Sequence, residues 1–92
     1  MVLNFEQVHN YYERLIFEEV ASRSGNYQDF NSDMLADVAC VALNRLPARY
    51  VRHDVDMMFY LTENERHVIE QSIEDVLKFA FGFVQDRLAK SR

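Results

Sequence analysis

The sequence has few residues that turn, cross-link or break a chain: 92 residues contain two Gly, one Pro and one Cys. A many-stranded sandwich or barrel needs a turn about every 8 to 12 residues, and these residues are too few for that. The single Cys40 excludes a disulfide within the chain and any metal site built from several cysteines. A mainly helical protein is therefore expected.

Long apolar runs are also missing, since no stretch approaches the roughly 18 uncharged residues of a membrane helix. The first residues lack the basic region that opens a signal peptide. Fifteen acidic residues outnumber ten Lys and Arg, and the resulting net charge of -5 opposes binding to nucleic acid. We expect one cytoplasmic domain over residues 1–92, with no membrane segment and no direct DNA binding.

Apolar residues recur at steps of three and four in three stretches, which predicts three main helices. The first begins at Asn4, whose side chain forms a capping box with Gln7, and it ends near Gly25. The second covers residues 33–44. Pro47 ends it, because the proline ring removes an amide donor and disfavours helical geometry in the preceding residue.

The third predicted helix is the longest. Thr62 and Glu65 form a capping box at its start, and Arg92 suits its C-terminal end. Phe79 and Phe83 lie beside its apolar stripe, which makes the apolar surface wider than two short helices can cover. We expect this face to be a dimer seam.

Residues 51–61 change period, because apolar and polar side chains alternate there as in a strand. A lone strand cannot satisfy its own backbone, and no other segment offers a good partner. We therefore expect this short extended segment to pair with its copy in a homodimer. One or two turns of helix in residues 54–60 are the alternative.

A basic cluster follows the second predicted helix, with three arginines in eight residues and no acid between them. Arginine forks bind phosphate and guanine edges, an aromatic ring stacks on a base, and carboxylates accept from it. Ion pairing of these arginines with surplus surface acids is the other interpretation. The candidate ligand residues are Asn44, Arg45, Arg49, Tyr50, Arg52, Asp54 and Asp56.

Catalytic and metal motifs are weak by comparison. Glu6 and His9 have the helical spacing found in di-iron bundles, but the chain lacks the second copy that such a site needs. His67 is expected to form a charge pair with Glu63 or Glu70, and Cys40 to be a small core residue. There is no phosphate loop, nucleophile elbow or dinucleotide fingerprint, so we predict no enzyme, no metal and no cofactor.

Residues 37–51 read DVACVALNRLPARYV. This stretch resembles the late competence development ComFB family, whose hallmark is Ala-Leu-Asn-x-Leu-Pro-x-x-Tyr, and the helices on either side are similar in order. The resemblance implies a small helical dimer without catalytic activity, linked by name to competence. The resemblance also implies binding of cyclic dinucleotides such as cyclic di-GMP, which is linked to some bacterial members of the family. Cysteines suited to zinc in some members are not matched here, where only Cys40 is present.

Two functional hypotheses follow. The first is a cytoplasmic homodimeric signalling module that binds a cyclic dinucleotide, with cyclic di-GMP favoured, around Pro47. The second is an interaction module without a ligand, related to competence or motility, that docks an unknown protein partner through Phe79, Phe81 and Phe83 of the long helix.

Overall fold

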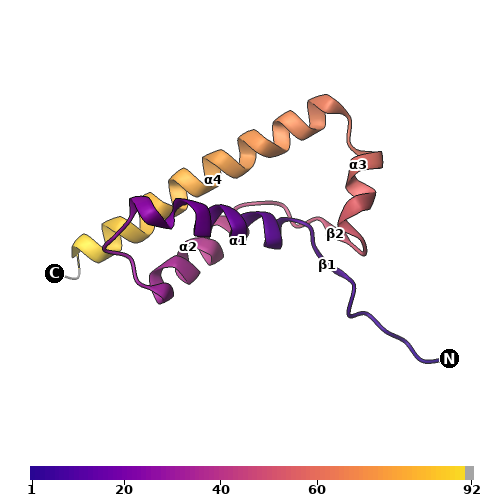
Figure 1. Ribbon diagram of the computed structural model, residues 1–92, viewed down its shortest axis with the longest axis horizontal. Coiled ribbons are helices and arrows are strands. Elements are labelled where there is room, and N and C mark those ends of the chain that lie inside the picture. Colours follow the sequence, from indigo (N-terminus) through magenta and orange to yellow (C-terminus); the bar gives the residue numbers. More distant parts are fainter. Residues whose placement is uncertain (91–92) are drawn as a thin grey trace.

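Helices make up most of the chain in the computed structural model, which describes residues 1–90 (Figure 1). The three long ones are α1 (Tyr12–Arg23), α2 (Ser32–Asn44) and α4 (Glu63–Lys90). The fourth α-helix of the described residues, α3 (Met57–Tyr60), is a single turn. The prediction of a mainly helical domain with three main helices is confirmed.

The core lies where α1, α2 and α4 pack together (Figure 1). Each helix contributes apolar side chains at helical spacing, and the largest that are fully buried are Ile16, Val38, Leu77 and Phe81. The connection from α1 to α2 covers part of this core, because the Tyr27 ring stacks on Phe81 with centroids 4.2 Å apart. Asn31 caps α2 by accepting a hydrogen bond from the Met34 amide, and the helix begins at Ser32, one residue earlier than expected.

The first helix begins eight residues later than predicted. Asn4 does not cap a helix: its Oδ1 accepts from the Glu6 amide in a turn, and the next residues form the short strand β1 (His9–Asn10). The Asn10 side chain then accepts from the Tyr12 amide as α1 starts. The predicted helical face shared by Glu6 and His9 therefore does not exist, since neither residue is in a helix.

The predicted strand over residues 51–61 is wrong for most of its length. In this stretch a strand forms only at β2 (Tyr50–Val51), which pairs antiparallel with β1 of the same chain. A 3₁₀ turn, η2 (Asp54–Asp56), and α3 follow, so the alternative of helical turns in residues 54–60 is confirmed. Because β1 is two residues long, no strand edge remains for the later residues, and their backbone groups bond locally instead.

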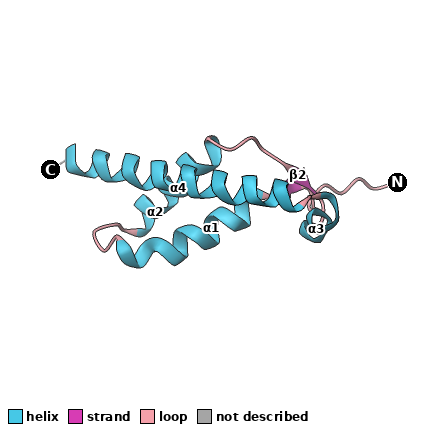
Figure 2. Cartoon of the chain, turned by 90° about the horizontal axis from the view of Figure 1, so that it is seen from above, coloured by secondary structure: helices cyan, strands magenta, loops and turns pink. Residues whose placement is uncertain are grey.

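The long helix begins as predicted. Thr62 Oγ1 accepts from the Glu65 amide and donates to the Glu65 carboxylate. Arg92, which the sequence assigns to the end of this helix, lies outside the described residues. Figures 1 and 2 place the N-terminal segment, β2 and α3 at one end of the molecule and the last turns of α4 at the other.

Two side chains differ from expectation in their exposure. Phe81 is only 2% exposed in the core, whereas Phe79 and Phe83 are exposed on the outside of α4, so Phe81 cannot join them on a docking face. Cys40 is exposed rather than a core residue. Its neighbours Val38, Ala39 and Ala42 turn toward α1 and α4, and Cys40 falls on the opposite side of α2.

Candidate functional site

The candidate ligand residues begin where α2 ends. Asn44 is the last residue of the helix, and its Nδ2 donates to the Cys40 carbonyl at 2.9 Å. Leu46, buried at 7% exposure, anchors the connection that follows. Around this anchor Arg45, Pro47 and Arg49 are exposed. The connection to β2 is thus held by one apolar side chain while the charged ones reach solvent.

Arg45 packs on the long helix. Its guanidinium carbon lies 3.8 Å from the centroid of the Phe79 ring, a distance at which cation and ring attract. Phe79 in turn stacks with Phe83 at 5.9 Å. The ring covers one face of the guanidinium, and the N–H edge is the part of an arginine that binds phosphate or a guanine edge.

Arg49 and Tyr50 are fixed through their backbone. The Arg49 amide donates to Asn10 Oδ1 at 3.1 Å, and its carbonyl accepts from the Tyr11 amide at 2.7 Å. Tyr50 is opposite Asn10 in the β1–β2 pair, with its side chain 69% exposed. The segment around Asn10 therefore fixes the backbone of two consecutive exposed residues, Arg49 and Tyr50, although Arg49 lies 39 residues later in the chain.

Three arginines of the site are left unpaired by the surplus acids. In residues 1–90 the ion pairs of arginine and lysine involve Arg14, Arg23 and Lys78, and none involves Arg45, Arg49 or Arg52. The ion pairs with surface carboxylates that the other interpretation expects for this cluster are therefore not found among residues 1–90. The positive charge stays available to an anion.

The two aspartates of the site have different surroundings. Asp54 Oδ1 lies 2.5 Å from His9 Nε2, and its Oδ2 lies 3.3 Å from an Arg14 nitrogen. The hydrogen bond to Asp54, together with one from the other ring nitrogen to the Gln7 carbonyl, raises the pKa of His9. Asp56, in the same 3₁₀ turn, uses its backbone amide to bond the His53 carbonyl. Only Asp54 is thus engaged in an ion-pair network.

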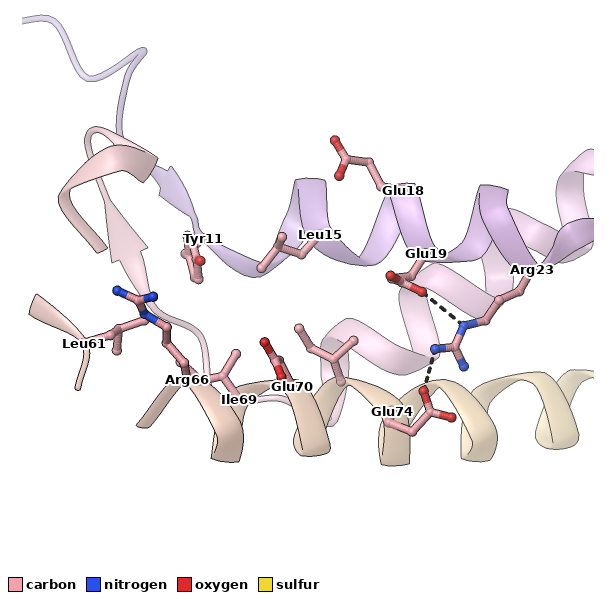
Figure 3. Close-up of a pocket in the computed structure, with 11 residues that line it drawn as sticks. Tyr11, Leu15, Glu18, Glu19, Arg23, Leu61, Arg66, Ile69, Glu70 and Glu74 are labelled. Atoms are coloured by element: carbon pink, nitrogen blue, oxygen red, sulfur yellow. Dashed lines mark hydrogen bonds and ion pairs between the residues drawn. The ribbon is translucent and has the colours of Figure 1, made fainter. Parts of the chain in front are cut away.

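The seven candidate residues follow one another along the chain from the end of α2 to η2, and this segment is called the band below. A hollow of about 420 Å³ lies elsewhere, between α1 and α4, and none of the seven lines it (Figure 3). Sequence reasoning missed His9 and Asn10, which hold the band from the N-terminal side. Nothing local signals their role, because His9 meets Asp54 from 45 residues away.

Two further observations concern metal binding and membrane-spanning helices in the part of the chain that the structure describes. No group of three or more His, Cys, Asp or Glu side chains there could hold a metal ion. No helix within residues 1–90 has the length and apolar character needed to cross a membrane.

Comparison with known proteins gives one family. The family model described as late competence development protein ComFB matches residues 9–88, which is most of the chain. The match includes β1, α1, α2, α3, all but the last two residues of α4, and the whole band of candidate residues. A search of the curated proteins finds no match.

Proposed function

The chain belongs to the late competence development protein ComFB family, and from this premise we propose that it is a non-enzymatic regulatory module that binds a cyclic dinucleotide. Cyclic di-GMP is the favoured ligand, and a homodimer is the proposed binding unit. The site is the band that follows α2. The net charge of -5 argues against direct DNA binding, so the ligand is small and the protein's output goes through a protein partner.

The observation that carries the proposal is the set of unpaired arginines. Acids outnumber bases by five in this chain, yet Arg45, Arg49 and Arg52 have no ion-pair partner among residues 1–90. Concentrating three unneutralised cations on one short connection carries an electrostatic cost unless an anion offsets it. A dinucleotide with two phosphates supplies two negative charges.

The side chains divide the ligand between them. Arg49 and Arg52 bind phosphate or a guanine edge through their forks, and exposed Tyr50 stacks on a base. Asn44 and Arg45 border the site on the side of α4. A guanine base also needs an acceptor for its N–H groups. Of the two candidates Asp56 is the better placed chemically, because Asp54 is already bonded to His9 and Arg14.

The open shape of the band favours a dimer. In a single copy the candidate side chains are exposed or half-exposed, and a cyclic dinucleotide has two equivalent halves. A two-fold axis presents the same residues to both halves and encloses the ligand from two sides. In this arrangement each dimer binds one ligand at the axis, whereas independent sites bind two.

Calorimetric titration of cyclic di-GMP tests the proposal. We expect saturable binding by the wild-type protein, at least a tenfold loss in Arg49→Ala, and no binding of GTP. Lys78→Ala is the control, since it removes one exposed positive charge from α4 outside the band. One ligand per two chains supports the bridging arrangement. No heat with the cyclic dinucleotide, or equal losses in both variants, contradicts the proposal.

Protein docking without a ligand is the second candidate function. Phe79 and Phe83 are 42% and 41% exposed, and their rings stack on the outside of α4. Exposed aromatic pairs are common at protein interfaces. In this case Phe83→Ala abolishes the biological output while Arg49→Ala leaves it intact. The reverse pattern rejects docking as the main function.

A further inference from the structure

A groove lies lengthwise between α1 and α4 on the side away from α2, and Figure 3 shows the side chains that line it. Its volume of about 420 Å³ falls in the range of sites that bind ligands or partner side chains. On α4 it extends from Arg66 to Glu74, eight residues or about 12 Å of helix rise. That length equals about two turns of a second helix.

The floor of the groove is apolar. Leu15 comes from α1, Ile69 and Ile73 come from α4, and all three are only partly buried although they pack against the core. Leu61 closes the end near α3. Apolar side chains that stay half exposed in a hollow between two helices offer a surface that another apolar side chain can cover.

The rim of the groove carries an excess of acid. Glu18 and Glu19 stand on α1, and Glu70 and Glu74 stand on α4, against only two arginines. Both arginines are already used, one at each end. Arg23 bonds Glu19 at 3.2 Å and Glu74 at 2.5 Å, and this bond lowers the pKa of Glu74.

The remaining rim charges are weakly compensated. Arg66 donates to the Met58 carbonyl at the other end of the groove. Glu70 rises from α4 toward α1 in Figure 3, and the His67 ring lies 3.8 Å from its carboxylate. Glu18 has Arg14 at the same distance on an exposed surface. The middle of the groove therefore has an apolar floor with the Glu70 carboxylate beside it, while the Glu18 carboxylate lies at the outer edge of α1, on the side away from α4 (Figure 3).

We infer that this groove binds an amphipathic helix of a partner protein that presents Leu-type side chains at positions i, i+3 or i+4 and i+7, flanked by Lys or Arg. The two walls of α1 and α4 form the kind of trough into which such a helix packs. The flanking cations meet Glu18 and Glu70, which gives the register and raises the association rate. The acidic rim repels phosphates, so this surface is distinct from the proposed nucleotide site.

The occupant is a different protein rather than a second copy. Each copy has a net charge of -5, and the acidic rim of one copy would meet the acidic surface of another. The basic connection after α2 is the exception, but it is not helical and offers no apolar stripe. A basic amphipathic helix is complementary to the groove in charge and in shape.

The probe that tests this inference is a labelled 14-residue peptide of Leu and Lys with the Leu residues on one helical face. Fluorescence anisotropy at low salt measures its binding to the whole protein. A peptide of the same composition in scrambled order and a Leu–Glu peptide with the same stripe are the peptide controls. We expect only the striped Leu–Lys peptide to bind tightly, with at least a tenfold preference over each control.

Variants locate the binding to the groove. Glu18→Lys with Glu70→Lys should weaken the striped peptide at least tenfold, while Asp86→Lys with Asp75→Lys, an equal charge change on α4 outside the lining residues, should change it less than twofold. Thermal unfolding checks that all variants fold. Equal losses in both pairs, or equal binding of the scrambled peptide, overturn the inference. Dimers that Glu70→Lys disrupts would identify a second copy as the occupant and also overturn it.

Discussion

The helical body and the end that carries β1, β2 and α3 are held together by different forces. In the body, Ile16, Val38 and Leu77 are completely buried between three helices. At the other end Met57 and Leu61 are buried, while Phe59 and its neighbours in α3 face solvent. Hydrogen bonds take the place of apolar burial there. Asn10 Oδ1 accepts from the amides of Tyr12 and Arg49, and His9 bonds Asp54.

This difference matters for function because the proposed nucleotide site crosses the boundary. Arg45 packs on α4 and belongs to the body, whereas Arg49 and Tyr50 take their position from β1. A region with few buried apolar contacts opens locally at lower cost than the core does. Binding of a ligand across the boundary would therefore order the weaker end, and the following variants test how separate the two regions are.

The largest expected contrast is between two phenylalanines. Phe81→Ala removes a core ring that is 2% exposed and should lower the free energy of unfolding by about 3–5 kcal/mol, enough to unfold much of a small domain. Phe59→Ala removes the same atoms from a ring that is 81% exposed, and about 0.5 kcal/mol or less is expected. Chemical denaturation followed by circular dichroism measures both. If both variants lose similar free energies of unfolding, α3 is buried in solution and does not differ from the helical body in the way described above.

The body is also the part that sequence alone predicts. Helical spacing of apolar residues, the Thr62–Glu65 capping box and the break before Pro47 are all local signals, and the structure contains each of them. Cys40 shows the limit of this approach. Small and apolar, it fits a core residue by type, yet its angular position on α2 turns it outward.

The end region could not be predicted because its structure depends on contacts between distant residues. The first helix starts after Asn10 rather than at Asn4, and Asn10 pairs with Tyr50, which is 40 positions later. Residues 51–61 alternate like a strand, but the available partner is two residues long. The candidate site shares this property: its residues remain a prediction from the sequence, and the contacts of this segment with His9 and Asn10 could not be predicted because they join distant residues.

Asn10→Ala tests whether polar bonds hold the end region. The variant leaves the amides of Tyr12 and Arg49 without their acceptor in a nearly buried position, and a loss of about 1–3 kcal/mol is expected. Asn4→Ala removes an exposed bond of the same type and should cost less than about 0.5 kcal/mol. Urea denaturation gives both values. If Asn10→Ala matches the control, the β1–β2 junction is not what fixes Arg49.

Thr62→Ala tests the boundary between α3 and α4. Loss of the cap on the first turn of α4 should cost about 1 kcal/mol, and Thr62→Ser, which keeps the hydroxyl, should cost much less. Hydrogen exchange shows where the loss falls. We expect faster exchange in α3 and the first turns of α4, with Leu77 and Phe81 unchanged. Faster exchange throughout α4 would mean that the two regions unfold as one unit.

The smallest effect is the pH dependence that His9 gives to the end region. The bonds of its ring to Asp54 and to the Gln7 carbonyl raise the pKa of His9, and the protonated ring donates to both. Because the pKa is higher in the folded than in the unfolded protein, this contribution is complete below about pH 6.5 and is lost as the pH rises through the folded pKa. The midpoint of urea denaturation should therefore fall between pH 6 and about pH 8 in the wild type by more than in His9→Gln. His67→Gln, at a ring 84% exposed, is the control and should keep the wild-type profile. Superimposable profiles for wild type and His9→Gln would show that the His9–Asp54 bond does not hold α3 to the N-terminal segment.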